Sequence, residues 1–293
     1  MATEEWDPTT YWAARNYRSS ARLHLQHTLF QNTLGHLLEP EVEAAIAGVK
    51  NPKVADLACG NGIWLVDLES ALAARGVTAP QLDGFDINPI NFPAAAYLPE
   101  AVTLTQLDIL ATPLPAHLLG AYDVVHVRAF ASSIQHADTA PLLAAARALL
   151  RPGGWLQWEE SRADAHTVEA PSPELSRAAC EGIVAVLNAG GRARGFEFGF
   201  LGELDRHLGA RGFEDARLRA TEVRRRDLKA WTEDYFMVWE ELYVHFPTEA
   251  EAPQAPMTRE KWVDLFSRAV KETEKGVVVH QGKIMSVVGR KAA

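Results

Sequence analysis

The sequence predicts an α/β fold built on a doubly wound, mostly parallel sheet. Apolar stretches with strand character alternate with stretches of helical spacing over residues 54–160. The first strand, at 54–57, enters a turn that contains Gly60 and Gly62, and a helix is expected next, at 63–75. This alternation is typical of parallel sheets, which bind ligands beyond the carboxyl ends of their strands.

The glycine turn is the first expected ligand contact. Gly60 and Gly62 let the backbone approach a ligand without an intervening Cβ, and the helix start offers unpaired N–H groups. Many strand-to-helix turns contain glycine for steric reasons alone, so the turn is a weak signal by itself. Trp64 and Leu65 stand where a nicotinamide dehydrogenase has its third glycine, which makes that class the weaker interpretation.

Acidic residues end the next strands. Three further strands are expected at residues 81–87, 104–109 and 121–128, and a fifth after the Pro-Gly-Gly turn at 152–154. Asp86 ends the second strand, where a doubly wound sheet places an acid on a ribose diol, and Asp108 ends the third. The alternatives are a helix N-cap for Asp86 and a turn-forming role for Asp108.

The ordered set of motifs resembles the class I S-adenosylmethionine-dependent methyltransferases. It comprises D-x-A-C-G-x-G at 56–62, the acids after the second and third strands, and L-x-P-G-G at 150–154. The resemblance implies a seven-stranded, Rossmann-like sheet whose last antiparallel strand pair includes residues 282–289. The pattern S-x-R-L-x-x-Q-H at 20–27 resembles methyltransferases of fungal natural-product clusters, including the gliotoxin-pathway N-methyltransferase type.

The resemblance implies a site for S-adenosylmethionine, with S-adenosylhomocysteine as the product. The implied cofactor residues are Tyr17, Arg22, Gln26, Asp56, Ala58, Gly60, Asn61, Gly62, Asp86, Ile87, Asp108, Ile109 and Arg128. Asp86 is expected to accept from the ribose hydroxyls and Asp108 from the adenine amine. Asp56 is expected to bind the methionine amine, directly or through water, or to hold the N–H groups of its own turn.

Methyl transfer from a sulfonium needs mainly alignment of the acceptor and exclusion of water. A base helps where the acceptor is protonated at neutral pH. We name His136, in the loop at 129–138, as a candidate base, with a solvated loop histidine as the alternative. Glu159 is the second candidate catalytic residue, since it or its neighbour Glu160 can steer a cationic amine.

An aromatic helix at 228–246 is expected to cover the acceptor as a lid, although such spacing is also typical of core. The candidate substrate contacts are Phe30, Tyr235, Phe236, Trp239 and Tyr243. The chain then divides into a helical cap at 1–50, a cofactor-binding core at 51–226 with a helical insertion near 171–200, the lid at 227–276 and a last strand at 277–293. Within the insertion we expect a helix from Ser172 to about residue 188 and a glycine-rich loop at 189–195.

Composition limits the partners. The chain has 293 residues, a net charge of −9 and a pI near 5.6, which disfavours nucleic acid as a substrate. No apolar run suggests a membrane span, and the acidic amino terminus argues against secretion. Two cysteines form neither a disulfide framework nor a metal site. We expect a cytoplasmic, metal-free protein that is a monomer or a homodimer.

We therefore expect a methyltransferase that acts on a nitrogen, oxygen or sulfur atom of a small hydrophobic secondary metabolite. One alternative is a methyltransferase-like pericyclase or cyclase that uses the bound sulfonium as a fixed positive charge. Demethylated cofactor that accumulates with substrate would separate these two. The other alternative is a non-catalytic regulatory module of the same fold, which failure to bind the cofactor would favour.

Overall fold

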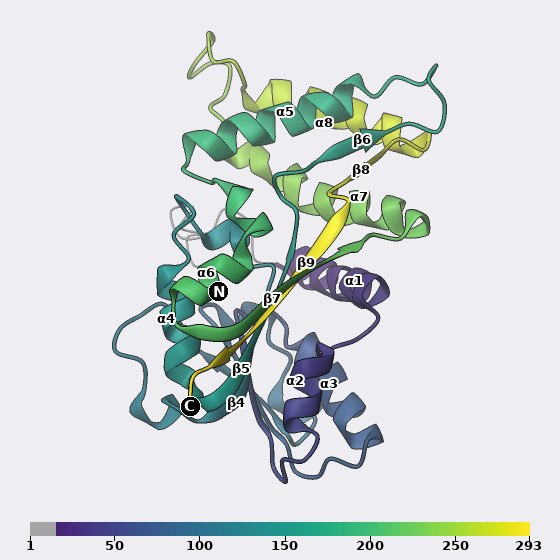
Figure 1. Ribbon diagram of the computed structural model, residues 1–293. Helices are drawn as coiled ribbons and strands as arrows, with labels where there is room; N and C mark the ends of the chain where they lie inside the picture. Colours follow the sequence, from purple (N-terminus) through teal and green to yellow (C-terminus); the bar gives the residue numbers. More distant parts are fainter. Residues whose placement is uncertain (1–15) are drawn as a thin grey trace.

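A seven-stranded sheet forms the centre of the computed structural model, which describes residues 16–293 (Figure 1). Its strands are β1 (Lys53–Leu57), β2 (Gln81–Asp86), β3 (Val102–Gln106), β4 (Tyr122–Arg128), β5 (Leu150–Ser161), β7 (Phe213–Glu222) and β9 (Lys283–Lys291). The order is β3-β2-β1-β4-β5-β9-β7, and the pairs from β3 to β5 are all parallel. Strand β9 runs antiparallel to both of its neighbours, β5 and β7, and the predicted fold class is confirmed.

Helices cover both faces of the sheet. On one face α2 (Pro40–Ile46) and α3 (Ile63–Ala74) bury an apolar cluster that includes Trp64 and Leu68. On the other, α4 (Ala140–Leu149) and α6 (Leu204–Ala210) pack against a second cluster with Leu143 and Leu208. Strand β4 is buried on both sides, as expected for the middle of a doubly wound sheet.

A third apolar cluster lies above the sheet in a helical layer (Figure 1). This layer consists of α1 (Tyr17–Leu34), α5 (Ala178–Ala193), α7 (Leu228–Trp239), α8 (Arg259–Glu274) and the strand pair β6 (Thr167–Glu169) and β8 (Val278–His280). Phe30 from α1, Trp231 and Phe236 from α7, and Trp262 from α8 all contribute to its core. The segment predicted as a lid is therefore one wall of a packed unit that also includes α1 and α5.

Some predicted element bounds are wrong. Helix α5 begins at Ala178 rather than at Ser172 and continues through Gly190 and Gly191 to Ala193, where we predicted a loop. The aromatic helix ends at Trp239 and gives way to the 3-10 helix η7 (Glu240–His245). The part of the predicted cap that precedes residue 16 lies outside the described residues. Within the described chain, no helix is both long and apolar enough to span a bilayer.

We predict that Gly84→Ala destabilises the sheet. Gly84 lies in β2, and a Cβ built there would come within 2.5 Å of Leu104 Cδ2, 2.9 Å of Cys59 Sγ and 3.0 Å of Leu65 Cδ1. Overpacking of this kind costs about 1–3 kcal/mol of unfolding free energy, measurable by urea denaturation. Gly48→Ala is the control, since nothing lies within 4 Å of its Cβ position, and equal stability losses in the two variants would contradict the argument.

Candidate active site

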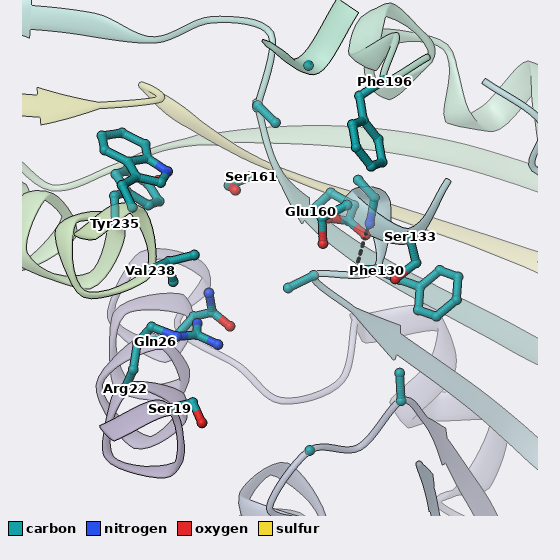
Figure 2. A pocket seen from close by; sticks show the side chains of 18 of the residues that line it. Ser19, Arg22, Gln26, Phe130, Ser133, Glu160, Ser161, Phe196, Tyr235 and Val238 are labelled. Carbon is teal, nitrogen blue, oxygen red and sulfur yellow. Dashed lines mark hydrogen bonds between the residues drawn. The ribbon is translucent and has the colours of Figure 1, made fainter. Parts of the chain in front are cut away.

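A cavity of about 490 Å³ lies at the carboxyl ends of the central strands, between the sheet and the helical layer (Figure 2). Its walls come from α1, the turn after β1, the ends of β2 and β5, the loop after β4, and helices α5 and α7. A crevice of about 40 Å³ shares Leu23, Gln26, Ala58, Gly60 and Arg128 with it. The two spaces therefore adjoin each other beneath α1, and their combined size suits a nucleoside cofactor and a small acceptor.

The turn after β1 and the end of β2 hold each other in place. Ala58 and Gly60 have φ of 56° and 60°, in the left-handed region, where a non-glycine residue is strained. The Gly60 N–H donates to Asp86 Oδ2 at 3.0 Å, and the Asn88 N–H donates to Asp86 Oδ1 at 3.0 Å. These backbone donors fix the Asp86 carboxylate at the cavity wall.

A cluster of three buried charged side chains lies beside the crevice. Asp56 Oδ1 is 2.7 Å from His126 Nδ1, and Glu159 Oε2 is 3.5 Å from His126 Nε2, an ion-pair contact without hydrogen-bond geometry. The Trp64 indole stacks on the imidazole, with 3.6 Å between ring centroids. Burial lowers the pKa of His126, but the two carboxylates outweigh burial and raise it. An imidazolium thus sits between two carboxylates, and it fixes Asp56 beside the glycine turn.

Arg128, at the end of β4, lines both spaces and is half-buried. Its Nη2 lies 2.8 Å from His27 Nδ1, and His27 Nε2 lies 2.8 Å from Asp67 Oδ2. Burial, and then the charge of Arg128, lower the pKa of His27, so the neutral ring accepts from Arg128 and donates to Asp67. Arg128 Nη1 has no hydrogen-bond partner among the described residues, which is the environment expected for a group that binds an anion.

The half of the cavity between β5, α5 and α7, where the acceptor is expected and which we call the acceptor half, contains a buried carboxyl group. Glu160 Oε1 accepts from the N–H groups of Phe130 (2.6 Å) and Ala131 (2.9 Å) and from Trp158 Nε1 (2.7 Å). Burial raises the pKa of Glu160 to about 7. Figure 2 shows Glu160 between the Phe130–Ser133 segment and Phe196, across the cavity from α1.

An aromatic wall completes this half. The rings of Tyr235 and Trp239 stack at a centroid distance of 5.3 Å, and His166 packs edge-on against them. Burial lowers the pKa of His166 to about 4, so this ring is neutral. On the same helix, Asp234 pairs with Arg22 at 4.0 Å and accepts from Gln26 at 3.4 Å. The acceptor half is thus largely apolar, with a few polar groups at its border with α1.

Comparisons with known proteins identify the family. A family model described as a methyltransferase domain matches residues 25–215. The chain belongs to this methyltransferase family. It is 36% identical to a protein named methyltransferase grgD from Penicillium sp, over 60% of each chain. It is 30% identical to N-methyltransferase verN from Clonostachys rogersoniana, over 56% of this chain and 54% of that one.

The match to these curated relatives spans between half and two thirds of their length. Among solved structures, the chain is similar to a phosphoethanolamine N-methyltransferase 2 from Haemonchus contortus in complex with S-adenosylhomocysteine. That similarity has a TM-score of 0.47 and 16% identity, over 96% of this chain and 61% of that chain. The family membership confirms the resemblance on which the predicted site was based.

Most of the implied cofactor residues of this methyltransferase domain come together. Those that line the larger cavity are Arg22, Gln26, Ala58, Gly60, Asp86, Ile87, Asp108, Ile109 and Arg128. Asp56 and Asn61 line the crevice. Their roles toward the cofactor stay predictions, but their positions agree with one continuous binding surface.

Two implied cofactor residues lie elsewhere. Tyr17 is the first residue of α1, is 84% exposed and lines neither space. Gly62 is the N-cap of α3 with φ 75°, and a Cβ there would come within 2.8 Å of Leu104 Cδ1. Gly62 therefore serves backbone geometry and packing, and the geometry does not support a cofactor contact for either residue.

The geometry does not support the two predicted catalytic residues. Glu159 faces the buried His126, because alternate residues of a strand point to opposite faces and Glu160 takes the cavity side. His136 is exposed, its N–H donates to the Gly195 carbonyl at 2.6 Å, and it does not line the cavity. We withdraw both as candidates for contact with the reacting atoms.

Some of the predicted substrate residues line the cavity and others do not. Tyr235 and Trp239 line the cavity, whereas Phe30 and Phe236 are buried in the core of the helical layer. Tyr243 follows the end of α7, is 44% exposed and lies off the cavity wall. Val238 and Leu242 also line the cavity beside Tyr235, although neither is among the predicted contacts. Their spacing at i+3 and i+7 from Tyr235 was the available signal.

Proposed function

We propose that this chain transfers the methyl group of S-adenosylmethionine to a nitrogen of a small hydrophobic molecule. The observation that carries the proposal is one cavity with two chemically different halves. One half presents Asp86, Asp108 and Arg128 around a glycine turn, and the other presents Tyr235 and Trp239. The first half suits a charged nucleoside and the second an apolar ring.

The residues of the first half fit the parts of this cofactor. Asp86 would accept from the ribose hydroxyls, in charge-assisted hydrogen bonds of about 1.5–3 kcal/mol each. Ile87, Asp108 and Ile109 would enclose the adenine. Arg128, with its unpartnered Nη1, would pair with the methionine carboxylate, beside Asp56 for the amine. When bound, S-adenosylmethionine supplies an electrophilic methyl group on a positively charged sulfur.

The acceptor half would orient the substrate and exclude water. Tyr235, Val238 and Trp239 offer apolar surface on which a planar molecule can lie. Alignment of reacting groups can lower a barrier by about 7–11 kcal/mol in favourable cases. A net charge of −9 supports a small molecule rather than a nucleic acid as the acceptor. The relatives named N-methyltransferases support nitrogen as the acceptor atom.

The test is incubation with methyl-deuterated S-adenosylmethionine and a metabolite extract of the source organism, followed by untargeted mass spectrometry. We expect a new species that carries the deuterated methyl group, and its fragmentation identifies the acceptor atom. A metabolite that changes without taking up label would contradict methyl transfer and indicate a pericyclic reaction. Absence of any change, together with absence of cofactor binding by calorimetry, would indicate a non-catalytic module.

A further inference from the structure

The two oxygens of Glu160 have different environments. All the hydrogen bonds that Glu160 accepts within the described part of the chain end on Oε1, and their donors are two backbone N–H groups and one indole. The donors hold the carboxyl group in a single orientation without adding a positive charge beside it. Since the residue lines the cavity, Oε2 is the oxygen that remains for a ligand.

We propose that Glu160 is the base that receives the proton of the acceptor nitrogen, and that the acceptor is a neutral, weakly basic N–H carried on an apolar molecule. This inference rests on the proposed methyl transfer. The nitrogen lone pair forms the new N–C bond while the C–S bond breaks, and the sulfonium becomes a neutral thioether. The N–H proton passes to Glu160 Oε2, so the positive and the negative charge disappear together.

The chemistry of the site favours this acceptor class. A nitrogen that is neutral at the start becomes acidic only as the N–C bond forms, so it needs a base within the cavity at that moment. A carboxyl group with a pKa of about 7 is half ionised near neutral pH and matches this task. Charges are costly to keep in a buried site away from water, so the transfer step is favoured because it removes a positive and a negative charge together.

Other titratable groups surround Glu160. Glu159, on the same strand, raises the pKa of Glu160 in addition to burial. The cavity wall also carries other charged or titratable side chains, namely Arg22 (α1), Asp86 (β2), Asp108 (after β3), Arg128 (β4), His166 (before β6), Arg194 (after α5), Asp234 and Tyr235 (α7) and His245 (η7). Since only the ionised form of Glu160 can accept a proton, the rate of methyl transfer is expected to rise with pH through the titration of Glu160. His166, with a pKa near 4, stays neutral over that range.

Asp234 is the competing base, because it also lines the cavity and burial raises its pKa to about 6. Its environment differs from that of Glu160. Its Oδ2 accepts from Gln26 at 3.4 Å, and its Oδ1 lies 4.0 Å from Arg22 in an ion-pair contact without a hydrogen bond, so the carboxylate is paired with a cation of α1, which Glu160 lacks. Asp234→Asn is thus a matched control, a buried cavity acid whose loss should leave the pH dependence of methyl transfer in place.

The experiment compares Glu160→Gln, Glu160→Asp and Asp234→Asn with the wild-type chain. Glu160→Gln keeps an oxygen for the three N–H donors and removes the base, and unchanged S-adenosylhomocysteine affinity by calorimetry shows that the fold is intact. The readout is the initial rate at which the deuterated methyl group of the cofactor enters a component of the metabolite extract. This rate is measured at saturating cofactor as a function of pH.

For Glu160→Gln we expect a rate about 10²–10⁴-fold lower, without the rising limb near pH 7. Glu160→Asp should keep the limb at an intermediate rate. A Glu160→Gln rate within threefold of wild type with the limb intact would overturn the assignment, as would loss of the limb in Asp234→Asn. If the wild-type chain itself transfers no label, the proposed function fails, and this inference fails with it.

Discussion

Replacement of His126 by Gln is expected to lower the free energy of unfolding by about 3–5 kcal/mol, the cost of breaking a buried ion pair. The imidazolium lies between Asp56 and Glu159, which are all but fully buried. Burial raises the pKa of Glu159, but His126 and Arg128 outweigh burial and lower it. Without His126, the carboxylates of Asp56 and Glu159 remain in the interior with less positive charge beside them. Urea denaturation of both proteins measures the difference.

The pH dependence of this difference has a defined sign. Because the folded-state pKa of His126 is raised above its ordinary value of 6.5, its contribution is fully present below that pH. The contribution is lost as the pH rises through the raised pKa. The stability gap between wild type and His126→Gln should therefore narrow at alkaline pH. A gap that widens with pH would contradict the imidazolium assignment.

A double variant separates charge from packing. Glu159→Gln removes one of the two carboxylates that His126 compensates. If the charge explanation holds, His126→Gln combined with Glu159→Gln loses less stability than the sum of the two single variants. Additive losses would show that the stacking of Trp64 on the ring, rather than its charge, accounts for the effect.

Replacement of Asp86 by Ala should weaken S-adenosylmethionine binding at least tenfold while the chain stays folded. The carboxylate is fixed by the Gly60 and Asn88 N–H groups at the cavity wall, and it would accept from two ribose hydroxyls. Each charge-assisted bond contributes about 1.5–3 kcal/mol, so a tenfold loss, about 1.4 kcal/mol, is a lower bound. Isothermal titration calorimetry measures the affinity directly.

Asp83→Asn is the matched control for Asp86. Asp83 lies on the same strand, three residues earlier, where it accepts from the Tyr122 hydroxyl at 2.8 Å outside the cavity. The amide can keep that hydrogen bond, so cofactor affinity should not change. Unchanged affinity in Asp86→Ala, or equal losses in both variants, would remove the proposed ribose contact.

The sequence was sufficient to predict the fold and most of the residues that line the proposed cofactor half of the cavity, around the glycine turn. The family resemblance implies the strand order, in which the second strand pairs with the first, so the acid that ends the second strand is expected beside the glycine turn. The structure bears this out in the hydrogen bond between Asp86 and Gly60. The antiparallel β9 was anticipated for the same reason, although the two-stranded sheet of β6 and β8 was not.

The acceptor half was harder to predict because its strands and helices are buried on more than one side. Both faces of β5 are covered, so alternation alone does not reveal whether Glu159 or Glu160 reaches the cavity. Helix α7 packs against α1 on one side and against α8 residues on another. Aromatic residues are therefore needed on more than one face of α7, and their spacing alone does not show that Trp239 lines the cavity whereas Phe236 does not. Only the three-dimensional arrangement of these elements distinguishes cavity from core.

A crystal structure of the chain with S-adenosylhomocysteine would decide whether the cofactor and the acceptor share this cavity. We expect the ribose hydroxyls to contact Asp86, the adenine to lie beside Ile87 and Asp108, and the methionine carboxylate to pair with Arg128. The sulfur should then face the half of the cavity that contains Glu160 and Trp239. A ligand bound outside this cavity, or one whose sulfur faces away from Glu160, would contradict the placement of cofactor and acceptor in one cavity.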